Sequence, residues 1–214
     1  MKFRTGAAIV RFILGPLETK LREDAKKLRM ITERDLEDRI VHHLSNRIDE
    51  EKFVITGNKT FRHLRIEGKS KKKKKFLMPD IIVRDKDENN RILIVIEIKH
   101  QIDSASAFLS RTADEKEVEY DCKKLNRYLK DSYLKPQIIH GFFIYLYNDR
   151  GYTESKIKKW LEEKFDNDKL DAIIINRYWN HKENKWYKKP EIAKIKKEFD
   201  KLYDIDVLKT WPNN

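Results

Sequence analysis

Asp80, Glu97 and Lys99 are the residues of this 214-residue chain whose types and spacing could do chemistry together. Glu97 and Lys99 end a long apolar segment, and residues two apart in a strand project from the same face. If the polar residues before that segment form a turn centred on Glu88 and Asn89, Asp80 lies opposite Glu97 in a hairpin. Two carboxylates and an amine then meet at one end of a sheet.

Neighbouring carboxylates repel each other, and Mg²⁺ relieves that repulsion because it prefers oxygen ligands. We expect Asp80 and Glu97 to bind Mg²⁺, the backbone carbonyl of Ile98 to complete the site, and Mn²⁺ to be able to substitute. With a cation there, a phosphoryl oxygen is polarised and a bound water is acidified, while Lys99 orients that water or stabilises charge on phosphorus. These residues therefore indicate hydrolysis of a phosphodiester.

The Glu-x-Lys triplet alone is not specific, because the same spacing recurs elsewhere, as from Glu18 to Lys20. The triplet Glu97-Ile98-Lys99 differs in ending an almost wholly apolar segment and in following the only Pro-Asp pair of the chain, Pro79-Asp80. The alternative interpretation is a solvent-exposed strand end, with Asp80 paired to a neighbouring base.

The pattern of Pro79-Asp80, sixteen residues and then Glu97-Ile98-Lys99 resembles the PD-(D/E)xK nuclease superfamily, which has the restriction-endonuclease-like fold. The resemblance covers about residues 32–176. It implies a Mg²⁺-dependent endonuclease acting on double-stranded or branched DNA, with Asp80 and Glu97 binding metal and Lys99 as the catalytic lysine. Gln101 stands where Mrr-type restriction enzymes and archaeal resolvases carry a glutamine, which makes it a further catalytic candidate.

Many members of that superfamily also place an acidic residue on the helix before the hairpin, where it contributes to catalysis and metal binding. Glu37 is our first candidate, because the run Leu36-Glu37 resembles the "FE" helix of the Mrr-type proteins. Glu33, one turn earlier on the same face, is the second. A position at the edge of an apolar stripe would also explain Glu37.

The elements that must position these residues follow from apolar periodicity and from capping and turn residues. They predict an α/β fold with a restriction-endonuclease-like αβββαβ core, in which helices flank a central mixed sheet, and C-terminal α/β additions. We expect an N-terminal helical segment at 1–30, the core at 31–176 and a helical extension of the same domain at 177–214. The predicted helices are 32–49, one containing Val118 to Leu129, one capped by Thr153, and 190–203; the strands are 53–56, 61–66, 76–84, 91–99, 138–147 and 170–176.

The apolar stretch Ala7 to Leu17 is too short to cross a bilayer, since Arg11 interrupts it and Gly15-Pro16 breaks it. It is expected to pack as an amphipathic helix on the domain or on a second subunit. The single Cys122 can form neither an internal disulfide nor a zinc site, so a cytoplasmic protein without a membrane partner is expected.

A formal net charge of +12 favours a polyanionic partner, here nucleic acid. Lys69 and the run 71–75 supply six of these charges, and +6 remains without them. That run is equally compatible with a solvated loop. A homodimer is expected because cutting two strands needs two centres. The alternatives are a nuclease acting on RNA and a binding module that has the scaffold but does not cut.

Two further groups have competing interpretations. The polar residues from Lys123 to Tyr128 could contact phosphate or form a solvated helix face. Tyr178, Trp179, Trp186 and Tyr187 could stack on bases, or pack in the core or at a dimer contact. The histidines show no metal-ligand spacing.

Overall fold

A five-stranded mixed sheet lies at the centre of the computed structural model, with its strands in sequence order. The three strands β1, β2 and β3 are antiparallel, whereas β3, β4 and β5 are parallel. This confirms the predicted α/β class with a central mixed sheet. The strands are β1 (Phe53–Gly57), β2 (Ile81–Asp85), β3 (Arg91–His100), β4 (His140–Tyr147) and β5 (Leu170–Asn176).

The structure describes residues 2–27, 29–30, 32–57, 79–87, 91–101, 111–130, 137–147, 153–180, 182–183 and 185–198, with the backbone alone at 111–115, 179 and 186. The predicted strand 61–66, the lysine-rich run, the first residues of the predicted strand 76–84 and the end of the helix 190–203 lie outside these residues.

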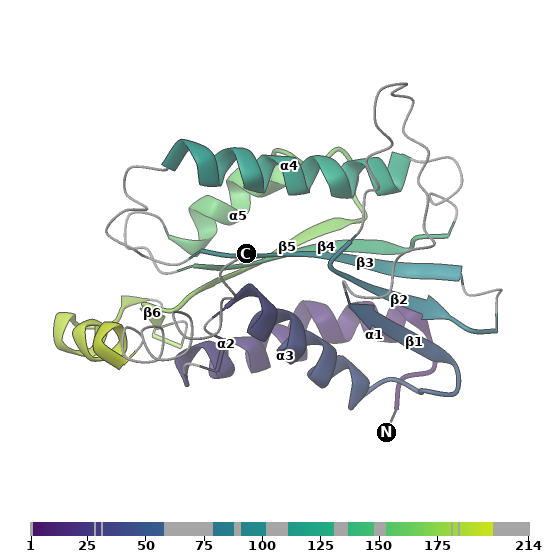
Figure 1. Cartoon of the computed structure of the whole chain (residues 1–214), viewed down its shortest axis with the longest axis horizontal. Helices are drawn as coiled ribbons and strands as arrows, with labels where there is room; N and C mark the ends of the chain where they lie inside the picture. Colours follow the sequence, from purple (N-terminus) through teal and green to yellow (C-terminus); the bar gives the residue numbers. More distant parts are fainter. Residues whose placement is uncertain are drawn as a thin grey trace, which may run out of the picture.

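Helices cover both faces of the sheet (Figure 1). An N-terminal group packs on one face and α4 with α5 on the other, and each layer encloses its own apolar cluster. The first group is α1 (Gly6–Phe12), the π-helical η1 (Ile13–Leu17), α2 (Glu18–Lys26) and α3 (Glu33–Ser45); the second is α4 (Arg111–Lys130) and α5 (Glu154–Glu162).

The N-terminal stretch from Ala7 to Leu17 is helical as expected, and the helix continues through Gly15 and Pro16. The π-helical turn of η1 contains Pro16 and runs directly into α2. Proline removes one helical N–H and crowds the preceding turn, and a wider π turn accommodates both effects without ending the helix. Ile13, Leu17 and Leu21 are fully buried and recur every four residues, so this segment packs on the domain itself.

Past β5 the chain forms a short hairpin of β6 (Trp179–Asn180) and β7 (Lys185–Trp186), followed by a helix over residues 189–198. Figure 1 shows this part beside the sheet, near α2. The hairpin was not predicted, since its two strands have two residues each and carry no readable alternation.

The register of β2 and β3 is what brings the chemistry-bearing residues together. Ile81 pairs with Ile96, and continuing this register by one residue places Asp80 opposite Glu97 as predicted. Nearer the turn, a β-bulge between Val83 and Arg84 shifts the pairing by one residue. The pairing next to the turn, Asp85 with Arg91, would by itself place the far end of the hairpin one residue out of the observed register. The bulge corrects this difference, so that Asp80 lies opposite Glu97.

Helix α3 begins with a capping box that fixes the start of the helix carrying Glu33. The Thr32 hydroxyl accepts from Asp35 N at 3.1 Å, and Thr32 N donates to the Asp35 carboxylate at 2.8 Å. This confirms Thr32 as the predicted N-cap, although the helix ends at Ser45 rather than residue 49.

Replacing Thr32 with alanine is expected to lower the free energy of unfolding by about 1 kcal/mol, because the backbone N–H of Asp35 loses its acceptor, the Thr32 hydroxyl. Urea unfolding measures the change. Thr19→Ala is the matched control, since exposed Thr19 lies within α2 and caps nothing. An equal loss in both variants would contradict the capping role.

Candidate active site

Asp80, Glu97 and Lys99 lie together where β2 begins and β3 ends. One carboxylate oxygen of Asp80 accepts a hydrogen bond from Ile98 N at 2.8 Å. Asp80 is therefore tied to the backbone of the strand that carries Glu97 and Lys99. The side chain of Ile98 points to the opposite face, into the apolar cluster beneath the N-terminal helices.

Glu97 is fully buried, and both of its carboxylate oxygens have partners. Lys124 Nζ lies 2.6 Å from Oε2, and the Tyr128 hydroxyl donates to Oε1 at 3.1 Å. Burial and the charge of Asp80 raise the pKa of Glu97 well above its usual range, against the opposing effect of Lys124. The predicted alternative of a solvent-exposed strand end is therefore wrong for Glu97.

Lys99 points to the same face as Glu97, toward α4. Its Nζ lies 2.6 Å from the Glu117 carboxylate. Burial alone would lower the pKa of Lys99, but the hydrogen bond to Glu117 and the charges of nearby carboxylates, Glu33 among them, raise it overall. The amine is consequently held protonated at neutral pH.

Helix α4 supplies most of the partners that surround this centre. Glu117, Asp121, Lys124 and Tyr128 recur at intervals of four, three and four residues, which places them on one face of a helix. Asp121 lies 3.4 Å from Lys124 Nζ, and burial and the charge of Asp80 raise its pKa despite that ammonium. Sequence reasoning missed Glu117 and Asp121, although their spacing with Lys124 was a readable signal.

The structure brings Glu33 to the cluster from α3. Its carboxylate lies 3.4 Å from the backbone N–H of His100. Burial and the charge of Asp80 raise the pKa of Glu33, while Lys99 lowers it. Glu37, our first candidate for the helix carboxylate, lies against Gly57 on β1, the edge strand two positions from β3.

Gln101 follows β3 and is fixed by β4. Its backbone N–H donates to Leu146 O at 2.9 Å, and its side-chain oxygen accepts from the Tyr145 hydroxyl. It thus shares the α4 face with Lys99, as the alternation of a strand requires. His100 points to the other face, where burial and neighbouring Arg177 lower its pKa to about 3.

The polar segment on α4 forms a solvated face only in part. Lys123 and Arg127 are exposed, as a solvated face requires, but Tyr128 is fully buried and Lys124 is nearly so. Asn126 is also buried and bonds the segment after α5. The solvated interpretation is wrong for those three residues, because their partners come from distant parts of the chain.

Where the structure describes them, Tyr178 is packed inside the protein, and His43 and His140 each lie against an aspartate. Tyr178 is buried at 3% exposure, which favours packing over stacking on bases. The side chains of Trp179 and Trp186, together with His63 and His181, lie outside the described residues. His43 pairs with Asp24 and His140 with Asp171, each at 2.8 Å.

Within the residues that the structure describes, no group of three or more His, Cys, Asp or Glu side chains is arranged to hold a metal ion. The donor chemistry nevertheless fits a hard divalent cation, because carboxylates outnumber ammonium groups at the centre. Asp80 raises the pKa of Glu33, Glu97 and Asp121. A cation bound among these oxygens would relieve that repulsion.

Comparison of the chain with protein-family models, with curated proteins and with solved structures found no match in any of the three. No helix in the described part of the chain is long and apolar enough to span a membrane.

Replacing Lys124 with methionine is expected to destabilise the fold by about 3 kcal/mol near neutral pH, because the buried Glu97 carboxylate would lose its ammonium partner. The pKa of Glu97 is raised in the folded state, so protonation stabilises folding below the unfolded pKa, and that stabilisation is lost as the pH rises through the folded pKa. The defect should therefore shrink on acidification toward the usual carboxyl range. Chemical denaturation across pH measures it.

Lys123→Met is the matched control, since Lys123 is the exposed neighbour of Lys124. It should change the unfolding free energy little at any pH. A Lys124→Met defect that is independent of pH would contradict a charge interaction between Lys124 and Glu97.

Proposed function

We propose that this chain is a Mg²⁺-dependent endonuclease that hydrolyses phosphodiester bonds of DNA, with Asp80, Glu97 and Lys99 at its centre. One observation carries the proposal. A fully buried glutamate at the end of a central strand lies among carboxylates that raise its pKa, beside a lysine held protonated. Such a set is costly for stability alone and suited to a phosphoryl group and a cation.

Asp80 and Glu97 would hold the cation, with the carbonyl of Ile98 as a further oxygen ligand. Of the two helix carboxylates, Glu33 has the better support, since its charge interacts with both Asp80 and Lys99. When bound, Mg²⁺ would supply polarisation of a phosphoryl oxygen and a more acidic water.

The side chains of the chain itself have distinct roles in this proposal. Lys99, kept protonated by Glu117, would place positive charge on the phosphoryl oxygens, where negative charge develops during attack. Gln101, held by Tyr145, would orient substrate or water beside Lys99. Lys124 and Tyr128 would fix the Glu97 carboxylate for its task.

Support for DNA as substrate comes from the net charge of +12 and from the resemblance of Pro79-Asp80 and Glu97-Ile98-Lys99 to the PD-(D/E)xK pattern. The order of α3, three strands, α4 and β4 also agrees with the αβββαβ core of the restriction-endonuclease-like fold, which we propose for this chain. A homodimer would supply two centres for two strands.

A second candidate is a nucleic-acid-binding module that does not cut. The ammonium of Lys124 lies 2.6 Å from the Glu97 carboxylate. In this second candidate, Lys124 balances the charge of Glu97 and no metal ion is needed there. The two candidates differ in whether a divalent cation binds at Asp80 and Glu97.

Purified protein is expected to nick or cut plasmid DNA in the presence of Mg²⁺. Asp80→Asn and Lys99→Ala should each reduce the rate at least about a hundredfold, because each removes charge from the reacting centre. Gel electrophoresis of the plasmid measures the rate. Asp87→Asn and Lys123→Ala, at exposed positions, are the matched controls and should cut normally. Cutting that survives at both site positions would refute the assignment, and parallel assays on RNA test the remaining substrate class.

Mg²⁺ or Mn²⁺ is expected to raise the melting temperature of the wild-type protein but not of Asp80→Asn. At a free cation concentration a hundred times the dissociation constant, the stabilisation should reach about 2.7 kcal/mol. Calorimetric titration of the same two proteins gives the stoichiometry. Uptake that is absent from wild type, or unchanged in Asp80→Asn, would favour the module that binds without cutting.

A further inference from the structure

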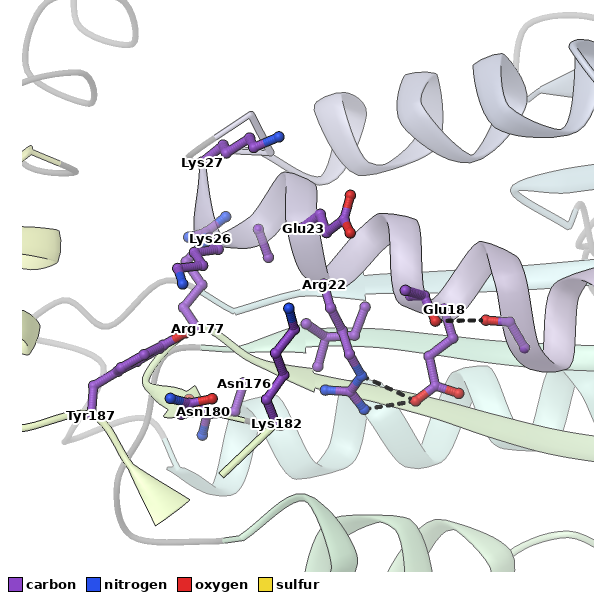
Figure 2. A pocket seen from close by; sticks show the side chains of 14 residues that line it. Glu18, Arg22, Glu23, Lys26, Lys27, Asn176, Arg177, Asn180, Lys182 and Tyr187 are labelled. Atoms are coloured by element: carbon purple, nitrogen blue, oxygen red, sulfur yellow. Dashed lines mark hydrogen bonds and ion pairs between the residues drawn. The ribbon is translucent and has the colours of Figure 1, made fainter. Parts of the chain in front are cut away.

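A cavity lies on the opposite face of the sheet from the candidate active site. It has a volume of about 700 Å³ and opens between α2 and the segment that follows β5. Figure 2 shows Lys26 and Lys27 at the end of α2 and Lys182 on the turn of the β6 and β7 hairpin. Its volume is within the range of pockets that hold small organic ligands, about 300–1,000 Å³.

Positive charge dominates the lining of this cavity. Lys26, Lys27, Arg177 and Lys182 line it, and the acidic lining residues are Glu18 and Glu23. Glu18 already pairs with Arg22 at 2.7 Å, and Arg22 also bonds Glu154 and Ile174 O. This network braces α2 against β5 and α5 and leaves a surplus of cations around the cavity.

Arg177 adds a buried cation to the exposed lysines. It is 3% exposed, directly after β5, and its Nη2 lies 3.3 Å from Nε2 of His100. Burial lowers the pKa of Arg177 to about 10, against the opposing effects of Tyr178 and Asp35. Its guanidinium is therefore a desolvated cation in the wall of the cavity.

The uncharged lining residues suit a base and a sugar. Tyr187 presents an aromatic ring with Lys26 Nζ 5.6 Å from its centroid, and Asn180 supplies an amide that can both donate and accept. An aromatic ring beside clustered cations is the usual arrangement for stacking a base while its phosphate is neutralised.

The position of the cavity relates it to the candidate active site. Strands β3, β4 and β5 are parallel, so the C-terminal ends of β3 and β5 share one edge of the sheet. His100 follows Lys99 in β3 and contacts Arg177 after β5. A strand of nucleic acid crossing this edge could therefore meet Lys99 on one face and the cavity on the other.

We propose that this cavity binds a nucleotide unit, with its phosphate at Lys27 and Lys182 and its base at Tyr187. This inference deepens the proposed function, because a nucleotide held here would position the same strand at Lys99. The ligand is either a unit of polymeric nucleic acid or a free nucleotide, and both share this chemistry.

The test measures binding without cleavage. Full-length protein in EDTA is titrated with a fluorescently labelled single-stranded oligonucleotide over a range of salt concentrations. The double variant Lys27→Ala with Lys182→Ala should bind more weakly, and the slope of log K against log salt should fall in magnitude by about 1.4, the loss of two phosphate contacts. The control, Lys156→Ala with Lys159→Ala, removes the same charge from exposed positions on α5 and should retain the wild-type slope.

A second pair of variants tests the base. Tyr187→Ala should weaken binding about tenfold, whereas Tyr187→Phe should bind nearly as wild type. Deoxyadenosine 5′-monophosphate and inorganic phosphate are titrated separately. A monophosphate that binds in a manner dependent on Lys27 and Lys182, without any effect on the oligonucleotide, would identify a free nucleotide as the ligand.

Equal losses of binding from the two lysine pairs, or no loss from either, would overturn the proposal, because oligonucleotide binding would then not depend on the lysines of the cavity. Phosphate binding as tightly as the nucleotide would overturn the role of Tyr187. Neither outcome depends on cleavage, so a protein that binds through this cavity but never cuts DNA refutes the proposed function and leaves this inference intact.

Discussion

The burial of Glu97 is the constraint on which the arrangement of this fold depends. A carboxylate without exposed surface at the end of a central strand loses its hydration, which costs several kcal/mol unless partners replace water. Lys124 and Tyr128 provide those partners, and both come from α4. The rotation of α4 on the sheet is therefore fixed by two polar contacts as well as by the apolar cluster beneath it.

Lys124 and Tyr128 give both oxygens of Glu97 a partner, but the carboxylates around Glu97 still repel one another. Asp80 and Asp121 raise its pKa, and Asp80 also raises that of Glu33 on the opposite helix layer. Buried ion pairs of this kind can often be replaced by apolar residues without loss of stability. Stability alone therefore gives no reason to keep this set, whereas the proposed cation and phosphoryl group would. This is the physical basis for preferring a catalytic role.

The sequence predicted the sheet well because its signals are local. Alternation and turn residues gave β3 and β5 nearly to the residue, and the hairpin placed Asp80 opposite Glu97. Features that depend on tertiary contacts could not be predicted as well from the sequence. The π turn at Pro16 was not predicted, and neighbouring positions on one helix face could not show that the charge of Glu33 acts on Lys99, because that depends on how α3 packs on the sheet.

The cavity could not be predicted from the sequence either, because its two walls are more than a hundred residues apart in the chain. No local pattern could join Lys27 to Lys182. What joins them is the packing of α2 against the end of β5, whose last residues, Ile175 and Asn176, also line the cavity. Lys99 and His100 point to opposite faces at the end of β3, so this strand end contacts the acidic centre under α4 through Lys99 and, through His100, Arg177 in the wall of the cavity beside α2.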